Sequence, residues 1–127
     1  MATTNFNWTA NTGADFEVEA NTTFGEIDAS MSSTITVSVT STNAATISTA
    51  NYRANSVFVI DEDGGDPAYA AITITVPSTK RGFFSIVNNT AFTVDVEISG
   101  QAKTAPSILA GETSILITDG TNIMQGS

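Results

Sequence analysis

The chain has 127 residues, the length of one ordinary domain, and 41 % of them are hydrophobic, which is enough to form a core. Thirteen acidic and four basic residues give a net charge of −9, so that a phosphate backbone or an anionic lipid surface repels it. No segment approaches the roughly 18 consecutive apolar residues of a membrane-spanning helix. We therefore expect no binding to nucleic acid and none to membranes.

The sequence contains neither histidine nor cysteine. This absence removes the commonest general base, the usual thiol nucleophile and most ligand sets for transition metals. The sequence also has no glycine-rich phosphate loop and no nucleophile elbow. We expect a protein that is not an enzyme, with no catalytic residues, no cofactor and no metal.

The first segment, residues 1–14, is polar, with Phe6 and Trp8 as its large apolar side chains. We interpret it as an N-terminal arm that precedes a single β-domain of residues 15–127. Aromatic side chains on a polar arm are typical anchors in protein interfaces, which makes Phe6 and Trp8 candidate partner-binding residues.

Alternation of apolar and polar residues then predicts half-buried strands along the chain. In residues 34–40, Ile35, Val37 and Val39 share one face and hydroxyl side chains the other. Two segments are apolar on both faces, which predicts central strands covered on each side by the chain or by another subunit. In chain order the predicted strands are residues 16–20, 34–40, 56–60 (apolar on both faces), 71–76, 82–87 (apolar on both faces), 92–98 and 113–118.

The connections are rich in residues that favour turns. Residues 42–54 have no apolar row at helical spacing and no capping box, so we expect a loop there. Pro77 should end the strand before it, and Lys80 and Arg81 then occupy a hairpin-like corner. Many short strands separated by turns predict an all-β domain, an antiparallel β-sandwich or a jelly-roll-like fold.

Two groups of carboxylates are candidate sites. Residues 61–66 place Asp61, Asp63 and Asp66 at a spacing similar to a calcium loop, but the twelfth position is Ile72 instead of glutamate. We favour a solvated hairpin tip and leave an ion site open. Asp95 and Glu97 share one strand face, where no cleft is expected, so a solvated or interface face is favoured over acid–base chemistry.

Trp8, Tyr52 and Tyr69 have the amphipathic rings that stack on sugars. No pattern in the sequence brings the three together. We favour anchoring in a core or a subunit interface, with a sugar-binding platform as the alternative.

The C-terminal part carries an ordered series of strand and turn motifs. A Thr/Ile/Val strand ends at Pro77, a basic pair follows at Lys80 and Arg81, and the next strand closes on an Asn-Asn-Thr turn at residues 88–90. A Thr/Val strand, Ala-Gly at residues 110–111 and Asp-Gly-Thr-Asn at residues 119–122 complete the series. In this order the motifs resemble a β-module that recurs in structural proteins of tailed bacteriophages, and the resemblance covers residues 72–122. That family often has an aromatic residue or a cysteine where Ile117 and Thr118 stand here.

The resemblance implies a structural protein located in the virion. Because the chain is short, we expect a capsid decoration or cement protein on the outer surface of a phage head, with the major capsid protein or another virion protein as its partner. The charge-poor apolar strands predict a homotrimer or another cyclic homo-oligomer. The alternative is a tail fibre, tail spike or tail-associated module that binds glycans of the host surface.

Overall fold

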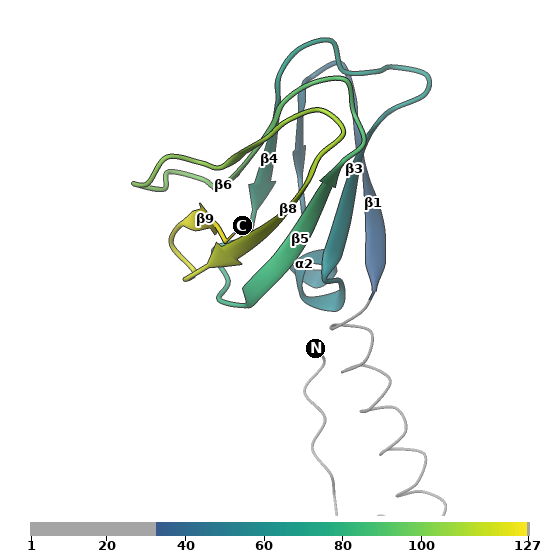
Figure 1. The fold of residues 1–127 in the computed structure, drawn as a ribbon. Coiled ribbons are helices and arrows are strands. Elements are labelled where there is room, and N and C mark those ends of the chain that lie inside the picture. The colour runs from purple at the N-terminus through teal and green to yellow at the C-terminus, as the bar shows by residue number, and fades with distance from the viewer. Residues whose placement is uncertain (1–32, 127) are drawn as a thin grey trace, which may run out of the picture.

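The computed structural model describes residues 33–126, which are mostly β-strands arranged in two sheets (Figure 1). The predicted arm of residues 1–14 with Phe6 and Trp8, and the predicted strand at 16–20, lie outside the described residues. The elements are β1 (Thr34–Val39), β2 (Ala44–Thr46), α2 (Thr49–Ala54), β3 (Val57–Glu62), β4 (Ile72–Val76), β5 (Gly82–Asn88), β6 (Val94–Ile98), β7 (Ser107–Ile108), β8 (Thr113–Thr118) and β9 (Ile123–Gln125).

The five-stranded sheet has the order β1-β3-β5-β8-β9, and the four-stranded sheet has the order β2-β4-β6-β7. The prediction of an all-β chain is confirmed at this level, and each of the six predicted strands within the described residues coincides with an observed one. The expectation that all pairing is antiparallel is wrong. Four pairs are parallel, namely β1–β3, β2–β4, β3–β5 and β4–β6, and three are antiparallel, namely β5–β8, β6–β7 and β8–β9.

The parallel pairs have a simple cause in the path of the chain. Each of the first five strands is followed by a crossing to the other sheet, so that β1, β3 and β5 run in one sheet and β2, β4 and β6 in the other. A strand that returns to its sheet by such a crossing lies parallel to its predecessor, whereas a tight turn makes it antiparallel. The chain therefore winds, adding one strand to each sheet per turn.

The connections at residues 61–66 and at Lys80 and Arg81 were expected to be hairpins, and this is also wrong. Residues 63–71 join β3 to β4, and residues 77–81 join β4 to β5, so both lead from one sheet to the other. Pro77 does follow directly after the last residue of β4, as predicted. The glycines and aspartates of these connections turn the chain between layers and not within a sheet.

One hydrophobic core receives side chains from both sheets. It contains Phe58 and Ile60 of β3, Phe84 and Ile86 of β5, and Leu116 of β8 from one side, and the isoleucines and valines of β4 and β6 from the other. The strands predicted to be central, β3 and β5, are central in their sheet. Only their inner faces are covered by the described part of the chain, because Val57 and Val59 are half-buried and Phe83 is 68 % exposed.

Residues 42–54 were expected to form a loop, but they contain the short strand β2 and the helix α2. The Ser48 side chain caps the helix by accepting a hydrogen bond from the backbone N–H of Asn51 (3.2 Å). The single buried residue of the helix, Tyr52, packs its ring against Phe58 and Phe84. One capping side chain and one buried aromatic ring stabilise this short helix. A helix of this length has no repeated apolar row, so the pattern used to predict helices does not detect it.

Asn88 is a buried polar residue at the end of β5, fully shielded from solvent. Its Nδ2 donates hydrogen bonds to the backbone carbonyls of Phe92 (2.7 Å) and Ile108 (2.9 Å). Its Oδ1 accepts from both the backbone N–H (3.0 Å) and the hydroxyl (2.7 Å) of Thr90. One side chain therefore fixes the connection from β5 to β6 and joins it to β7.

Replacing this side chain tests its importance. We expect Asn88→Ala to lower the free energy of unfolding by about 2–4 kcal/mol, because it leaves buried donors and acceptors without partners. The neighbouring Asn89 is exposed, and Asn89→Ala should change stability by less than about 0.5 kcal/mol. Urea unfolding of both variants measures the difference, and equal effects would contradict this role of Asn88.

Candidate functional site

The outer face of the five-stranded sheet is apolar. Strand register places Val57 and Val59 of β3 in line with Ser85 and Val87 of β5, and Phe83 and Ser85 of β5 opposite Ile117 and Ile115 of β8. Phe83 is 68 % exposed and Ile115 is 43 % exposed. We call this surface the apolar face; its members are Val57, Val59, Phe83, Val87, Ile115, Ile117 and Met124.

Hydroxyl side chains border the apolar face. Thr34 and Thr36 of β1 lie beside Val57 and Val59, and Thr113 of β8 lies opposite Val87. Asp61, at the end of β3, is the acidic residue that shares this side of the sheet. Phe83 and Ile115 are exposed and the other members of the face are half-buried. An apolar surface without charges in its centre is typical of a surface that binds another protein.

The outer face of the four-stranded sheet is different in character. Register aligns Thr73 of β4 with Asp95 of β6, and Thr75 with Glu97, and all four side chains are half-buried. The Ser107 hydroxyl of β7 donates a hydrogen bond to Asp95. Asp95 and Glu97 thus lie on one flat strand face, as the sequence indicated, among hydroxyl groups. This arrangement suits a solvated surface.

The carboxylates of residues 61–66 organise their own connection. Asp63 Oδ2 accepts hydrogen bonds from the backbone N–H groups of Gly65 (3.2 Å) and Asp66 (2.9 Å). Ser38 donates to Asp63 Oδ1 (3.3 Å), and Ser41 donates to Asp66 Oδ2 (3.1 Å). Within residues 33–126 no group of three or more acidic side chains is arranged so that it could hold a metal ion. These carboxylates act as caps of a turn.

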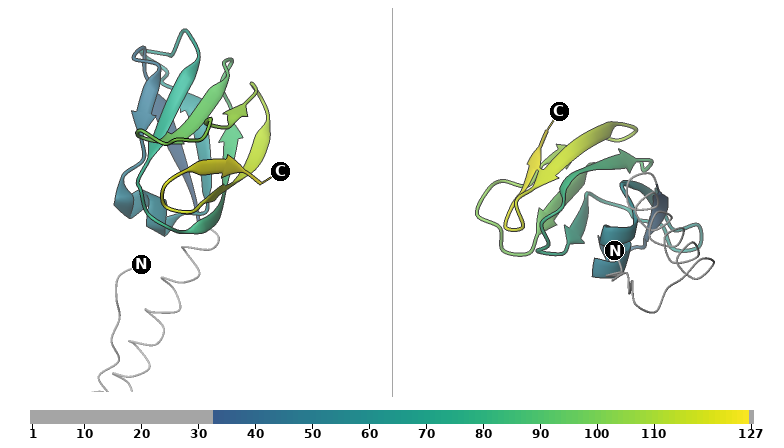
Figure 2. Two further views of the ribbon diagram at one scale, coloured as in Figure 1. Left: turned by 90° about the vertical axis from the view of Figure 1, so that its left-hand side faces the viewer. Right: turned by 90° about the horizontal axis from the view of Figure 1, so that it is seen from below.

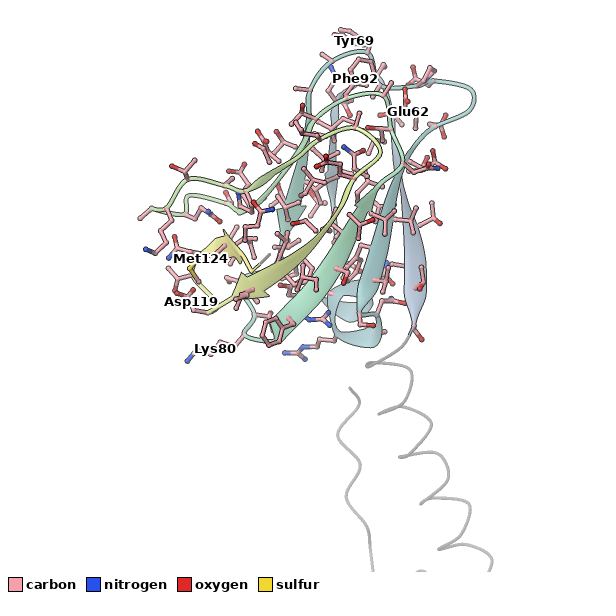
Figure 3. The ribbon with its side chains drawn as sticks, viewed as in Figure 1. Glu62, Tyr69, Lys80, Phe92, Asp119 and Met124 are labelled. Atoms are coloured by element: carbon pink, nitrogen blue, oxygen red, sulfur yellow. The ribbon has the colours of Figure 1, made fainter. Side chains whose placement is uncertain are left out.

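The aromatic residues singled out in the sequence are not brought together. Tyr52 is fully buried in the core beside α2, at the end of the molecule where β1 begins (Figures 1 and 2). Tyr69 is 70 % exposed and lies at the opposite end, the end that also carries Phe92 and Glu62 (Figure 3). Trp8 lies outside the described residues. Tyr52 is thus a core anchor, and it cannot share a sugar platform with Tyr69.

Arg81 has a structural role that was not predicted from the sequence, where it was assigned only to a hairpin-like corner. Its guanidinium donates hydrogen bonds to the backbone carbonyls of Tyr52 and Asn55, at the C-terminal end of α2. It also lies over three rings, with its central carbon 5.0 Å from the ring centroid of Tyr52, 5.6 Å from Phe84 and 5.9 Å from Phe58. It therefore satisfies the open carbonyls of the helix and closes one end of the core. The feature of the sequence that could have indicated this role is a basic residue directly before a strand that contains aromatic residues.

The Asp-Gly-Thr-Asn motif of residues 119–122 shapes the turn between β8 and β9. Asp119 Oδ1 accepts hydrogen bonds from the backbone N–H groups of Thr121 and Asn122, both 2.8 Å. These hydrogen bonds, the one from Asn122 first, lower the pKa of Asp119. Gly120 has a φ of +90°, where a side chain would be strained and would meet Lys80. The motif is thus explained by local geometry and needs no ligand.

The burial of Tyr52 generates a prediction about alkaline pH. Burial raises the pKa of Tyr52 to about 12, with Arg81 and Thr118 as smaller opposing influences. A pKa raised on folding adds stability below pH 10, the unfolded value, and this stability is lost as the pH rises through 12. We expect urea midpoints to fall between pH 10 and 12, and Tyr52→Phe to reduce that fall. Tyr69→Phe, which alters an exposed ring, is the control and should leave the fall unchanged.

No family model, no curated protein and no solved structure matches the chain. Among residues 33–126, no helix is long and apolar enough to cross a membrane. Of the two outer sheet faces in the described part of the chain, the apolar face is the one whose composition differs from an ordinary solvated surface.

Proposed function

We propose that the chain is a virion structural protein, a capsid decoration or cement protein that binds the outer surface of a phage head. The observation that carries the proposal is the apolar face, with Phe83 68 % and Ile115 43 % exposed on one flat sheet. A flat apolar sheet face is suited to binding another folded surface. The resemblance of residues 72–122 to phage structural modules supplies the kind of partner, the major capsid protein or another virion protein.

The two outer faces favour an adhesive role over a catalytic one. A partner that covers the apolar face buries apolar area without having to desolvate charges. The opposite face carries Asp95 and Glu97 and is suited to contact with water. In fold terms we classify the two layers as a sandwich with parallel winding in place of a jelly roll. Such a module presents one adhesive side and one solvated side.

We also propose that copies of the chain associate through the apolar face into a homotrimer or another cyclic oligomer, each copy burying part of this face against its neighbours and presenting the remainder to the shell. Each copy carries a net charge of −9, so copies repel one another except where they meet through uncharged surface. The apolar face meets this condition, because its centre holds only apolar and hydroxyl side chains. Contacts made in this way depend little on ionic strength.

Association through the apolar face can be tested with paired variants. Phe83→Thr combined with Ile115→Thr keeps strand-forming residues but removes the largest exposed apolar groups. We expect this variant to be a folded monomer at micromolar concentration when measured by light scattering, while the unmodified chain is an oligomer. Thr73→Ser combined with Asp95→Asn, on the other sheet, should leave the oligomer intact. A monomeric unmodified chain would overturn this interface.

Location in the virion has a separate test. Quantitative mass spectrometry of purified particles should find the many copies of a head protein, and moderate salt should not remove them. The double variant at Phe83 and Ile115 should be lost from particles, whereas the double variant at Thr73 and Asp95 should be retained. A few copies at the tail, or release by moderate salt, would contradict a cement protein of this kind.

The second candidate is a tail fibre or spike module that binds host glycans. The observation in its favour is the end of the molecule that carries Tyr69, which is 70 % exposed. Asn43 holds the backbone there by accepting hydrogen bonds from the N–H groups of Tyr69 (2.9 Å) and Ala70 (3.2 Å). A glycan array separates the candidates. Saturable sugar binding that is lost in Tyr69→Ala would favour the tail module, and no binding would favour the head.

A further inference from the structure

Within residues 33–126, the outer edge of β1 is open. β1 pairs with β3 on one side, and no described strand pairs with its other side. Five of its six residues, Thr-Ile-Thr-Val-Ser-Val, are β-branched strand formers, and none is charged, proline or glycine. Proteins usually protect such an edge, because unpaired N–H and C=O groups on a flat, uncharged strand attract another strand.

The other sheet edges differ from β1. The far edge of the five-stranded sheet is β9, with three residues, and the edges of the four-stranded sheet are β2, with three, and β7, with two. Short strands are one of the ways in which proteins protect an edge. The long open strand therefore stands at the N-terminal end of the winding, where β1 is the first strand.

Within the described part of the chain, the core is also less fully covered at this end. Among the described residues, four hydrophobic side chains pack against the core without being fully buried, and three of them, Ile35, Val37 and Ala45, belong to β1 and β2. These are the inward-facing residues of the two strands that start the winding. An additional strand on each sheet would cover them.

The spacing of the winding indicates where such strands lie in the sequence. Thr34 aligns with Val57, 23 residues later, and Val57 with Ser85, 28 later. In the other sheet Ala44 aligns with Thr73, 29 later, and Ile72 with Val94, 22 later. One turn of the chain thus takes 22, 23, 28 or 29 residues.

Counting 29 residues back from β1 and β2 places apolar residues opposite the inward-facing residues of both strands. It aligns the inward row Ile35, Val37 and Val39 with Phe6, Trp8 and Ala10. It also aligns Ala45 with Phe16, and the buried Ile47 with Val18. Of the four spacings, only 29 places apolar residues at all five positions.

The outward positions agree with this alignment. The exposed hydroxyl row of β1, which is Thr34, Thr36 and Ser38, aligns with Asn5, Asn7 and Thr9. The exposed positions of β2 align with Asp15 and Glu17, which would extend the acidic outer face that carries Asp95 and Glu97. Both faces of both added strands therefore match the sheet that they would join.

We propose that residues 5–10 and 15–18 form one further turn of the winding, residues 5–10 pairing in parallel with β1 and residues 15–18 with β2 and the residue that follows it. The strands that cover these edges come from the chain's own N-terminal segment. A strand from another chain would have no reason to match the 29-residue spacing of an observed turn, whereas a further turn of the same chain would. Phe6 and Trp8, which the sequence analysis assigned to an external partner, then cover Ile35 and Val37. The proposal does not depend on the proposed function.

The single tryptophan of the chain, Trp8, reports on this directly. In the native full chain we expect its fluorescence to be shifted to the blue relative to the urea-unfolded chain and to be protected from acrylamide. The same measurement on the monomeric Phe83→Thr, Ile115→Thr variant separates this burial from burial between copies. Emission typical of a water-exposed tryptophan in the folded variant would overturn the proposal.

Cross-linking tests the register. The chain has no cysteine, so that Asn7→Cys combined with Thr36→Cys introduces the only two thiols. Paired strands lie about 4.8 Å apart, within the range that a disulfide spans. We expect rapid oxidation to a disulfide within one chain, and little for Asn7→Cys combined with Ser107→Cys on β7. Equal rates for the two pairs, or disulfides only between copies, would show that the segment does not occupy its own edge in this register.

Stability measurements distinguish the inward row from an arm that grips a shell. Phe6→Ala combined with Trp8→Ala should lower the Tm of the isolated protein by several degrees, while Asn5→Ala combined with Asn7→Ala should leave it unchanged. An unchanged Tm in the first variant would overturn the proposal. Particle binding is read separately, so failure of the proposed function leaves this result intact.

Discussion

The crossing of the chain from one sheet to the other after each of its first five strands is the constraint on which the remaining structure depends. Each crossing brings the next strand of a sheet alongside the previous one in parallel, with its apolar row toward the other sheet. The inward rows then stack into one core. The winding stops where β7, β8 and β9 return in antiparallel pairs.

Crossings create polar groups that must be satisfied away from regular pairing. Asn88 does this where β5 ends, since its amide group bonds to the backbone of the next connection and of β7. Arg81 does it just before β5, where the guanidinium donates to the carbonyls of Tyr52 and Asn55 at the C-terminal end of α2 and lies over three aromatic rings. Polar side chains thus secure both ends of the central strand, while the strand itself contributes Phe84 and Ile86 to the core.

A two-layer structure leaves two outer faces, and here they differ. The four-stranded sheet shows threonine and carboxylate side chains, and the five-stranded sheet shows Phe83, Ile115 and neighbouring valines. For copies that each carry a net charge of −9, the uncharged face is the surface at which the proposed association meets the least repulsion and desolvation. The proposed adhesive role rests on this difference between the faces.

The sequence by itself determined which segments are strands and which residues of each strand face the core, because alternation with a period of two is a local property. Ile35, Val37 and Val39 of β1 and the alternating rows of β4 and β6 could be assigned in this way. The sequence also showed that β3 and β5 are apolar on both faces. It did not show that the described part of the chain leaves the second of these faces uncovered. The helix α2 escaped prediction because a single cap and a single buried tyrosine define it. Tertiary structure alone decided which strands pair, in which direction, and that Tyr52 in α2 and Tyr69 lie at opposite ends (Figures 1 and 3). The reason is that hairpins and crossings use the same turn residues, and the choice between them depends on burying one face against a second sheet that is distant in sequence.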